Sequence, residues 1–281
     1  MTSPQDYHLI TTEEQLDALC LELSQAPFIA VDTETEGLNY TDIIVGIALS
    51  HKAGSGYYIP IRHEAVDGIR YDNQLPPSAV YAKLKPILET VPCVGHNVKF
   101  DLKMFWKDGI DVNYVHDTLI MAHILDVSVN GARGLKHLVK HYLHHEMNDI
   151  DSLFPKIGNK KPDIRPKILS PEDIEYYGCE DGNWSMQLYT FLSRMFENKP
   201  KLKFVYSIEM RLLRVVAEME SFGVPVSLEF LKTNSAKAET YLESLRESIL
   251  TNLRKQLNDP EYEVNFKSPK QLSTLLFDHL N

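Results

Sequence analysis

Two carboxylates near the N-terminus, Asp32 and Glu34, are spaced for chemistry on one face of a β-strand. They follow the apolar run 28–31, which predicts that they lie at the end of a buried strand. Side chains two residues apart on a strand point to the same face, so both carboxylates should point the same way. Like charges in a partly buried place repel each other unless a cation lies between them. The pair therefore indicates a cation site, and the alternative interpretation is a strand end with two solvated acids.

A further acidic position, Asp101, lies four residues after Asn97 in a predicted helix. Asn97 is of a type that caps helix N-termini, and Asp101, one turn later, lies on the same side of the helix. Leu102, Phe105 and Trp106 supply the apolar face. Taken alone, the pattern more commonly belongs to an ordinary capped helix that carries a surface acid.

A phenol and a carboxylate, Tyr177 and Asp181, lie one helical turn apart further along the chain. The helix that carries them is predicted to begin after Ser170, a good N-cap that is followed by proline and two acids, and to run to about Met195. A phenol one turn from a carboxylate can hold a water at the edge of a metal site. The alternative is a core aromatic residue whose hydroxyl reaches the rim of the core.

These residues must be positioned by a region in which strands come early and helices follow. Apolar periodicity and turn signals predict an α+β fold. The predicted strands cover residues 7–10, 28–32, 43–50, 57–60 and 93–95. The predicted helices cover residues 12–24 and 79–89, and others begin near residues 97, 117, 134 and 170.

The segment after residue 200 is predicted to be helical throughout. Asn198–Pro200 has the composition of a boundary. The predicted helices cover residues 203–222 and 227–258, and a last one begins after Ser268. We therefore expect two domains, an α+β domain over residues 1–200 and a helical C-terminal annex over residues 201–281.

The net charge of −10 is confined to the first domain, because residues 201–281 hold 11 basic and 11 acidic side chains. A protein that coats DNA should be basic, whereas an enzyme that gathers carboxylates around divalent cations can be acidic. The composition thus disfavours a non-specific DNA-binding module. Cys20, Cys93 and Cys179 lie singly in apolar segments and are predicted to be reduced core residues. Without a signal pattern or an apolar stretch of about 20 residues, we expect a cytoplasmic protein with no membrane partner.

Together and in this order, the acidic motifs resemble those of the DEDD exonuclease superfamily, in its tyrosine-bearing branch. The chain is most similar to the 3′→5′ proofreading domain of family A DNA polymerases, the bacterial DNA polymerase I type. The three motifs cover Phe28–Ser50, Val94–Phe105 and Tyr177–Leu188. The resemblance continues beyond them, since Glu209–Val226 and Asn265–Phe277 look like the start of the polymerase thumb.

The resemblance implies a ribonuclease H-like fold, with a mixed sheet flanked by helices, and two divalent cations. Asp32, Glu34 and Asp181 would hold one ion. Asp32 would bridge to the second ion, which Asp101 would serve through water. Carboxylate ligands independently favour Mg²⁺ or Mn²⁺ over zinc. Tyr177 would orient the attacking water during two-metal-ion hydrolysis of the phosphodiester.

Four further positions match DNA-contacting residues of the family. Leu38 matches a wedge against the terminal base, and His96 and Asn97 match positions near the scissile nucleotide. Arg133 matches a phosphate-contacting arginine. The alternatives are turn packing for Leu38 and a solvated charge for Arg133. The chain departs from the family at Gly182–Trp184, which replaces a usual Ala-Asp pair, but no metal ligand is expected there.

Two other groups of side chains invite a functional interpretation. Lys156–Lys167 forms a basic loop that could guide single-stranded DNA or could simply be solvated. His137, His141, His144 and His145 recur at helical spacing. Without an acid–histidine catalytic motif, we interpret them as part of a solvated helix rather than as a metal site.

The expected function is removal of nucleotides from single-stranded or frayed 3′ ends of DNA, with no polymerase activity, because no polymerase carboxylate motif is present. The chain would be either a separate exonuclease that partners a polymerase subunit or a fragment of a longer polymerase. One alternative is a catalytically silent module that braces a polymerase, but such a module has no need of four acids and Tyr177. Another is an RNA-trimming exonuclease of the same superfamily. The thumb-like tail favours DNA, although nothing in the sequence tests for a 2′-hydroxyl.

Overall fold

The computed structural model describes residues 6–39, 41–126, 133–154 and 165–280. The chain forms two compact units that divide between Phe222 and Gly223. The division falls after helix α7 (Pro200–Phe222), rather than near residue 200, because α7 packs against α3 (Val98–Lys107) and α4 (Thr118–Leu125). The functional assignment of residues 1–200 and 201–281 stays a prediction. No helix in the described ranges is both long and apolar enough to cross a membrane.

A mixed six-stranded sheet forms the centre of the first unit, in the order β1-β4-β3-β2-β5-β6. The strands are β1 (Asp6–Leu9), β2 (Ile29–Thr35), β3 (Ile44–Ser50), β4 (Ser55–Pro60), β5 (Cys93–Gly95) and β6 (Tyr114–Asp117). β2 runs antiparallel to β3 and parallel to β5, so the sheet combines both directions, as predicted. The sequence did not predict β6, an edge strand of four residues without an apolar run.

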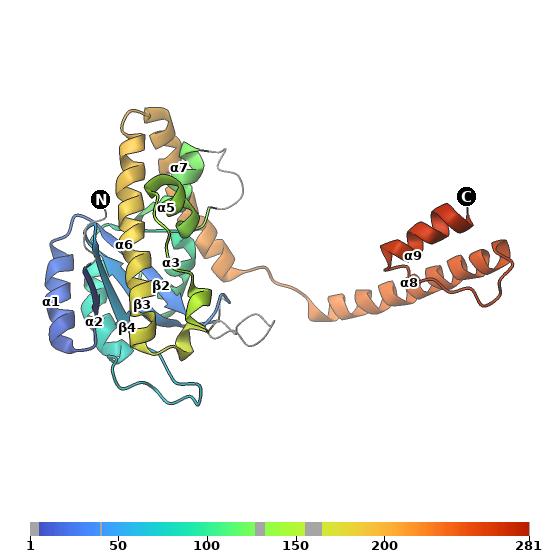
Figure 1. The fold of residues 1–281 in the computed structure, drawn as a ribbon, viewed down its shortest axis with the longest axis horizontal. Coiled ribbons are helices and arrows are strands. Elements are labelled where there is room, and N and C mark those ends of the chain that lie inside the picture. The colour runs from blue at the N-terminus through green and yellow to red at the C-terminus, as the bar shows by residue number, and fades with distance from the viewer. Residues whose placement is uncertain (1–5, 40, 127–132, 155–164, 281) are drawn as a thin grey trace. The chain divides into compact units, whose positions relative to one another are not determined.

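Helices cover both faces of the sheet (Figure 1). Helices α1 (Glu13–Ser24) and α2 (Pro77–Leu88) pack on one face together with part of α3. Their contribution to the largest core consists of Leu16, Leu19, Leu23, Val80, Leu84, Leu88, Met104 and Phe105. Helix α6 (Pro171–Phe196) lies on the opposite face and contacts every strand from β1 to β5. The sheet is thus enclosed between helical layers.

Strand register decides which face of the sheet carries the acidic residues. Val31 packs in the core beneath α1 and α2, whereas Asp32 pairs with Ala48, which packs against α6. Glu34 lies two residues further along β2 and shares the face of Asp32. Both carboxylates therefore point toward α6, as their spacing predicts.

Local sequence signals set the ends of the main helices. Helix α1 begins with a capping box in which Thr12 and Gln15 exchange side-chain and backbone hydrogen bonds. Helix α6 begins with Ser170, whose hydroxyl accepts a hydrogen bond from the backbone N–H of Asp173. These caps offset unpaired N–H groups in the first turn, so both helices begin where the sequence predicts. The three cysteines are free thiols, as predicted, with Cys93 and Cys179 buried and Cys20 half-buried.

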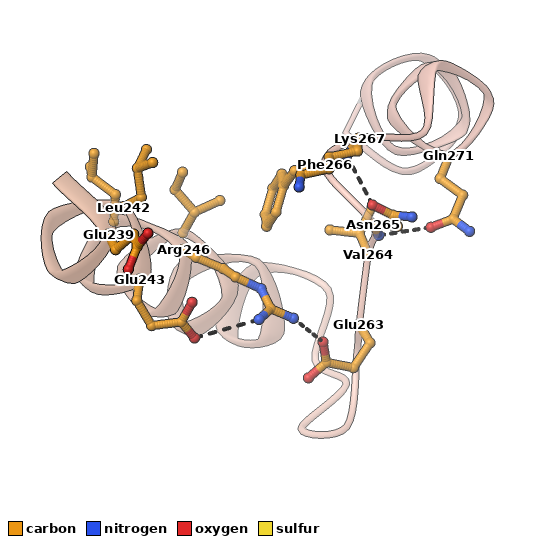
Figure 2. A pocket seen from close by; sticks show the side chains of 12 residues that line it. Glu239, Leu242, Glu243, Arg246, Glu263, Val264, Asn265, Phe266, Lys267 and Gln271 are labelled. Atoms are coloured by element: carbon orange, nitrogen blue, oxygen red, sulfur yellow. Dashed lines mark hydrogen bonds and ion pairs between the residues drawn. The ribbon is translucent and has the colours of Figure 1, made fainter. Parts of the chain in front are cut away.

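The second unit consists of a long helix and a shorter one around a small core. Helix α8 (Leu228–Gln256) packs through Leu250 and Leu253 against Val264 and Leu275. Helix α9 (Pro269–Thr274) continues into a π-helical turn over Leu275–His279. An open pocket of about 1100 Å³ lies between α8 and the segment 263–271. Figure 2 shows its apolar wall and the Arg246 guanidinium, which pairs with Glu243 and Glu263.

Helix α6 approaches the sheet closely at Gly178, where a Cβ atom would lie 2.4 Å from Cδ2 of the fully buried Tyr58. We expect Gly178→Ala to lower the free energy of unfolding by about 1–3 kcal/mol, because overpacking outweighs the ~1 kcal/mol by which alanine favours a helix. Urea denaturation measures the change. In a Tyr58→Leu background the same substitution should cost much less, and an equal cost in both backgrounds would contradict this close packing.

Candidate metal centre

Three carboxylates meet between strand β2 and helix α6. One oxygen atom from each of Asp32, Glu34 and Asp181 lies within 4.8 Å of the other two. Glu34 and Asp181 are buried, and Asp32 is half-buried. Within the described ranges this is the only group of three or more acidic, histidine or cysteine side chains with metal-ligand spacing. We call these three residues the carboxylate trio, and its all-oxygen donor set suits Mg²⁺ or Mn²⁺.

Burial raises the pKa of every member of the carboxylate trio well above its ordinary value. Desolvation is the largest cause, and repulsion from neighbouring carboxylates adds to it, while the ammonium group of Lys136 acts in the opposite direction on Glu34 and Asp181. A carboxyl group with a raised pKa stabilises the fold at low pH and loses that contribution as the pH rises through its pKa. A divalent cation between the carboxylates would remove this penalty.

The fourth predicted carboxylate, Asp101, lies beside the trio and is held by strand β2. It is 3% exposed, and its Oδ1 accepts hydrogen bonds from the backbone N–H of Thr33, at 3.1 Å, and from the Thr33 hydroxyl. Burial raises the pKa of Asp101 although these hydrogen bonds act to lower it. Its charge in turn raises the pKa of Asp32 and Glu34. All four predicted carboxylates therefore share one electrostatic environment.

Helix α3, which carries Asp101, is held at its start by a residue that the sequence did not single out. Asn97 occupies the N-cap position, but its backbone is left-handed, with a φ of 61°, and its side chain makes no capping hydrogen bond. The buried Asp117 carboxylate accepts hydrogen bonds from the N–H groups of Asn97 and Val98 at 3.1 and 2.9 Å. It also caps α4 through the N–H of Leu119. Asn97 is thus the N-cap residue of α3, as predicted, but a carboxylate from another segment makes the capping hydrogen bonds instead of its side chain.

Tyr177 and Asp181 are brought together on α6 as their spacing predicts. The Tyr177 hydroxyl, one helical turn from Asp181, acts as a donor toward its carboxylate to lower the pKa of Asp181. Desolvation, and then the charges of the trio, raise the pKa of Tyr177. The phenol therefore stays protonated and can donate a hydrogen bond. Lys136 Nζ lies 4.9 Å from the centroid of the Tyr177 ring.

A pocket of about 410 Å³ opens beside these side chains. Its lining consists of Asp32, His96, Gly134, Leu135, Lys136, His137, Tyr177 and Asp181. His96 Nδ1 lies 2.8 Å from the hydroxyl oxygen of Thr118. Burial lowers the pKa of His96 to about 4, so the imidazole is neutral near pH 7. Among the described residues, Nε2 of His96 has no hydrogen-bond partner.

The other three predicted DNA contacts do not line this pocket. The side chain of Leu38 is 88% exposed in the turn after β2, and Asn97 is exposed at the start of α3. Arg133 is half-buried before α5 (Leu135–Leu143), and its buried Nε lacks a hydrogen-bond partner within the described part of the chain. Their roles toward DNA stay predictions.

The basic loop falls mostly outside the described residues. Lys156, Lys160 and Lys161 all lie in the segment 155–164. Lys167, at its end, is described and forms ion pairs with Glu36 at 3.3 Å and Glu64 at 2.8 Å. At least this lysine is engaged with protein carboxylates.

The histidines that recur at helical spacing do not form a metal site within the described ranges. His137 and His141 are exposed, as expected for a solvated helix, and His144 is exposed at the C-cap. His145 differs, because it lies 3.3 Å from the buried carboxylate of Glu180 and stacks on Trp184. Lys136, in the first turn of α5, lines the pocket together with Asp32 and Asp181, although its sequence context gave no signal beyond that place in the helix.

Comparison with known proteins places this geometry in a family. Residues 7–197 match the family model described as 3′-5′ exonuclease. DNA polymerase I of Borreliella burgdorferi is 30% identical over 278 residues, which are 98% of this chain and 28% of that polymerase. The chain thus spans less than a third of the length of this polymerase and of DNA polymerase I from Pseudomonas aeruginosa.

Solved structures share the fold. The POL domain of Pol1 from M. smegmatis, in complex with DNA primer-template and dNTP, has a TM-score of 0.69 at 18% identity, over 96% of this chain and 40% of that one. RNase D from Escherichia coli has a TM-score of 0.54 at 21% identity, over 76% of this chain and 51% of that one. These likenesses confirm the predicted ribonuclease H-like fold with its mixed sheet and flanking helices. Because the family model matches residues 7–197, more than half of the chain, the chain belongs to the 3′-5′ exonuclease family of family A DNA polymerases.

Proposed function

We propose that this protein is a metal-dependent exonuclease that removes nucleotides from the 3′ ends of DNA, in a proofreading role beside a polymerase. The observation that carries the proposal is the carboxylate trio, which brings Asp32, Glu34 and Asp181 together beside a pocket that Asp32 and Asp181 line. Membership of the 3′-5′ exonuclease family supports the reaction. The relatives named DNA polymerase I support DNA as the substrate and a polymerase as the partner.

The residues present fit two divalent cations. The trio would hold one ion, and Asp32 and Asp101 would serve the other, with Asp101 acting through water. The fit rests on oxygen donors that are close together and whose charges are costly in the absence of a cation, because burial and mutual repulsion raise their pKa values. When bound, Mg²⁺ or Mn²⁺ would stabilise the charge that develops on the oxygens of the phosphodiester during hydrolysis.

The protein's own side chains would orient the reactants. Tyr177, protonated and one helical turn from Asp181, would hold the attacking water beside the trio. Thr33 donates two hydrogen bonds to Oδ1 of Asp101, and these bonds fix the position of the carboxylate. Leu38, His96, Asn97 and Arg133 would contact the unpaired 3′-terminal nucleotides.

Chelation should abolish nucleotide release from labelled single-stranded DNA, and added Mg²⁺ or Mn²⁺ should restore it. The physical reason is that the carboxylates have no other Lewis acid to act with. Gel analysis of a 5′-labelled oligonucleotide before and after excess EDTA measures the effect. Undiminished cleavage in EDTA would contradict the metal-dependent reaction, and no cleavage with any divalent ion would favour a silent structural module.

Unpaired 3′ ends should be cleaved faster than matched duplex ends, because the terminal nucleotides must leave the duplex to reach the pocket. Single-stranded, mismatched and matched substrates of one DNA sequence, together with the equivalent RNA, would be compared at equal concentration.

We expect Leu38→Ala to reduce the rate on mismatched ends and to leave the fold intact, because this side chain is exposed. Equal rates on matched and mismatched ends would argue against proofreading, and a faster rate on RNA would indicate an RNA-trimming enzyme.

Asp181→Ala and Tyr177→Phe should differ in severity although both residues lie on α6. Asp181→Ala removes a proposed metal ligand, so activity should fall by several orders of magnitude. Tyr177→Phe keeps the ring and removes only the hydroxyl, so a loss of about 10- to 1,000-fold is expected with metal affinity largely retained. Steady-state rates and Mn²⁺ titration distinguish the two. A wild-type rate for Tyr177→Phe, or activity of Asp181→Ala at saturating Mg²⁺, would refute these roles.

A further inference from the structure

Lys136 places a positive charge at the edge of the carboxylate trio. It lies in the first turn of α5, and its Nζ is 4.9 Å from the centroid of the Tyr177 ring. It lines the same pocket of about 410 Å³ as Asp32 and Asp181. Among the described residues that line the 410 Å³ pocket, Lys136 is the only lysine or arginine.

The ion pair that now holds Lys136 is weak enough to exchange. Nζ lies 3.1 Å from Oδ1 of Asp149, whose side chain is 70% exposed, whereas the Lys136 side chain is 34% exposed. Ion pairs that face water contribute little to stability, typically ~0–1 kcal/mol. An anionic group that enters the pocket would therefore compete readily with Asp149 for the ammonium group.

A neighbouring lysine shows what an ordinary surface pair looks like on the same helix. Lys140 lies one turn after Lys136 and pairs with Glu146, and both side chains are mostly exposed. Lys140 is not among the residues that line the pocket. Lys136 differs from it in contacting an aromatic ring of the site and in facing the pocket, so solvation of the helix surface does not account for its position.

We propose that Lys136 is a phosphate-binding residue of this site, in addition to the predicted Arg133. When a nucleic acid 3′ end enters the pocket, the ammonium group leaves Asp149 and contacts a non-bridging oxygen of a terminal phosphodiester. This inference rests on the proposed function, and it adds a substrate contact that explains how a polyanion approaches a cluster of carboxylates.

A phosphate contact has a signature that a structural ion pair lacks. Each phosphate neutralised by a lysine on single-stranded nucleic acid contributes about 0.7 to the slope of log affinity against log salt. We therefore expect Lys136→Gln to weaken binding of a labelled single-stranded oligonucleotide about 10-fold and to reduce this slope by about 0.7. Fluorescence anisotropy in Ca²⁺ over a series of KCl concentrations measures both quantities. In steady-state assays with Mg²⁺, KM should rise more than kcat falls.

Three further variants make the test specific. Lys136→Arg keeps the charge and should restore most of the salt slope, and Lys140→Gln removes a matched surface lysine and should resemble the wild type. Asp149→Asn breaks the ion pair while leaving Lys136 free, so it should bind DNA as tightly as the wild type or a few-fold more tightly. If Asp149→Asn weakens binding as much as Lys136→Gln does, or if Lys136→Gln keeps the wild-type slope, the ion pair is structural and the proposal is wrong.

Failure of this inference is distinguishable from failure of the proposed function. Absence of metal-dependent cleavage by the wild-type protein would refute the nuclease, whereas the binding series tests Lys136 without any need for cleavage. Unchanged salt dependence of Lys136→Gln in a wild-type protein that cleaves DNA would refute only the phosphate contact.

Discussion

The repulsion between carboxylates that are buried together is the constraint on which the rest of this structure depends. Asp32, Glu34 and Asp181 bring their oxygens within 4.8 Å of one another, and Asp101 shares their electrostatic environment. Each would keep its proton more readily here than in water, because desolvation and like charges both oppose ionisation. Such an arrangement persists only if the surrounding fold contributes more stability than the cluster costs, and if a cation can remove the cost.

The fold meets this constraint by fixing the acids on rigid elements. The period of two along β2 turns Asp32 and Glu34 toward α6, and the close approach of α6 at Gly178 brings Asp181 within reach. Asp101 is held by Thr33, and the helix beneath it is held by Asp117, itself a buried carboxylate that accepts backbone hydrogen bonds. The large apolar core between the sheet and α1 to α3 thus stabilises a fold that carries charged groups on the opposite face of the sheet.

What the sequence could predict follows from how local each signal is. Asp32 and Glu34 share a face because of strand periodicity, and Tyr177 lies beside Asp181 because the two are one helical turn apart. Both arrangements could therefore be predicted from the sequence. The cap that Asp117 supplies joins segments about 20 residues apart and carries no local pattern. The division of the compact units after Phe222 depends on the packing of α7 against α3 and α4, which composition near residue 200 does not encode. The sequence did not single out Lys136 for the same reason, since its position in the site depends on its contact with Tyr177, which lies on another helix.

The residues of this site also differ in how firmly they are held, and the difference suits their tasks. The proposed metal ligands would have to be placed before an ion arrives, because reorganising several charged groups would consume binding free energy. The carboxylates are accordingly buried or half-buried on a strand and two helices. Binding of a nucleic acid 3′ end of variable base sequence would instead require adjustable contacts, since no single rigid surface fits every terminal nucleotide. Leu38 and Asn97 are exposed at the ends of elements, and Lys136 holds its carboxylate partner through a solvent-facing pair. Fixed acids surrounded by adjustable contacts would allow one site to accept any unpaired end while keeping the geometry of hydrolysis constant.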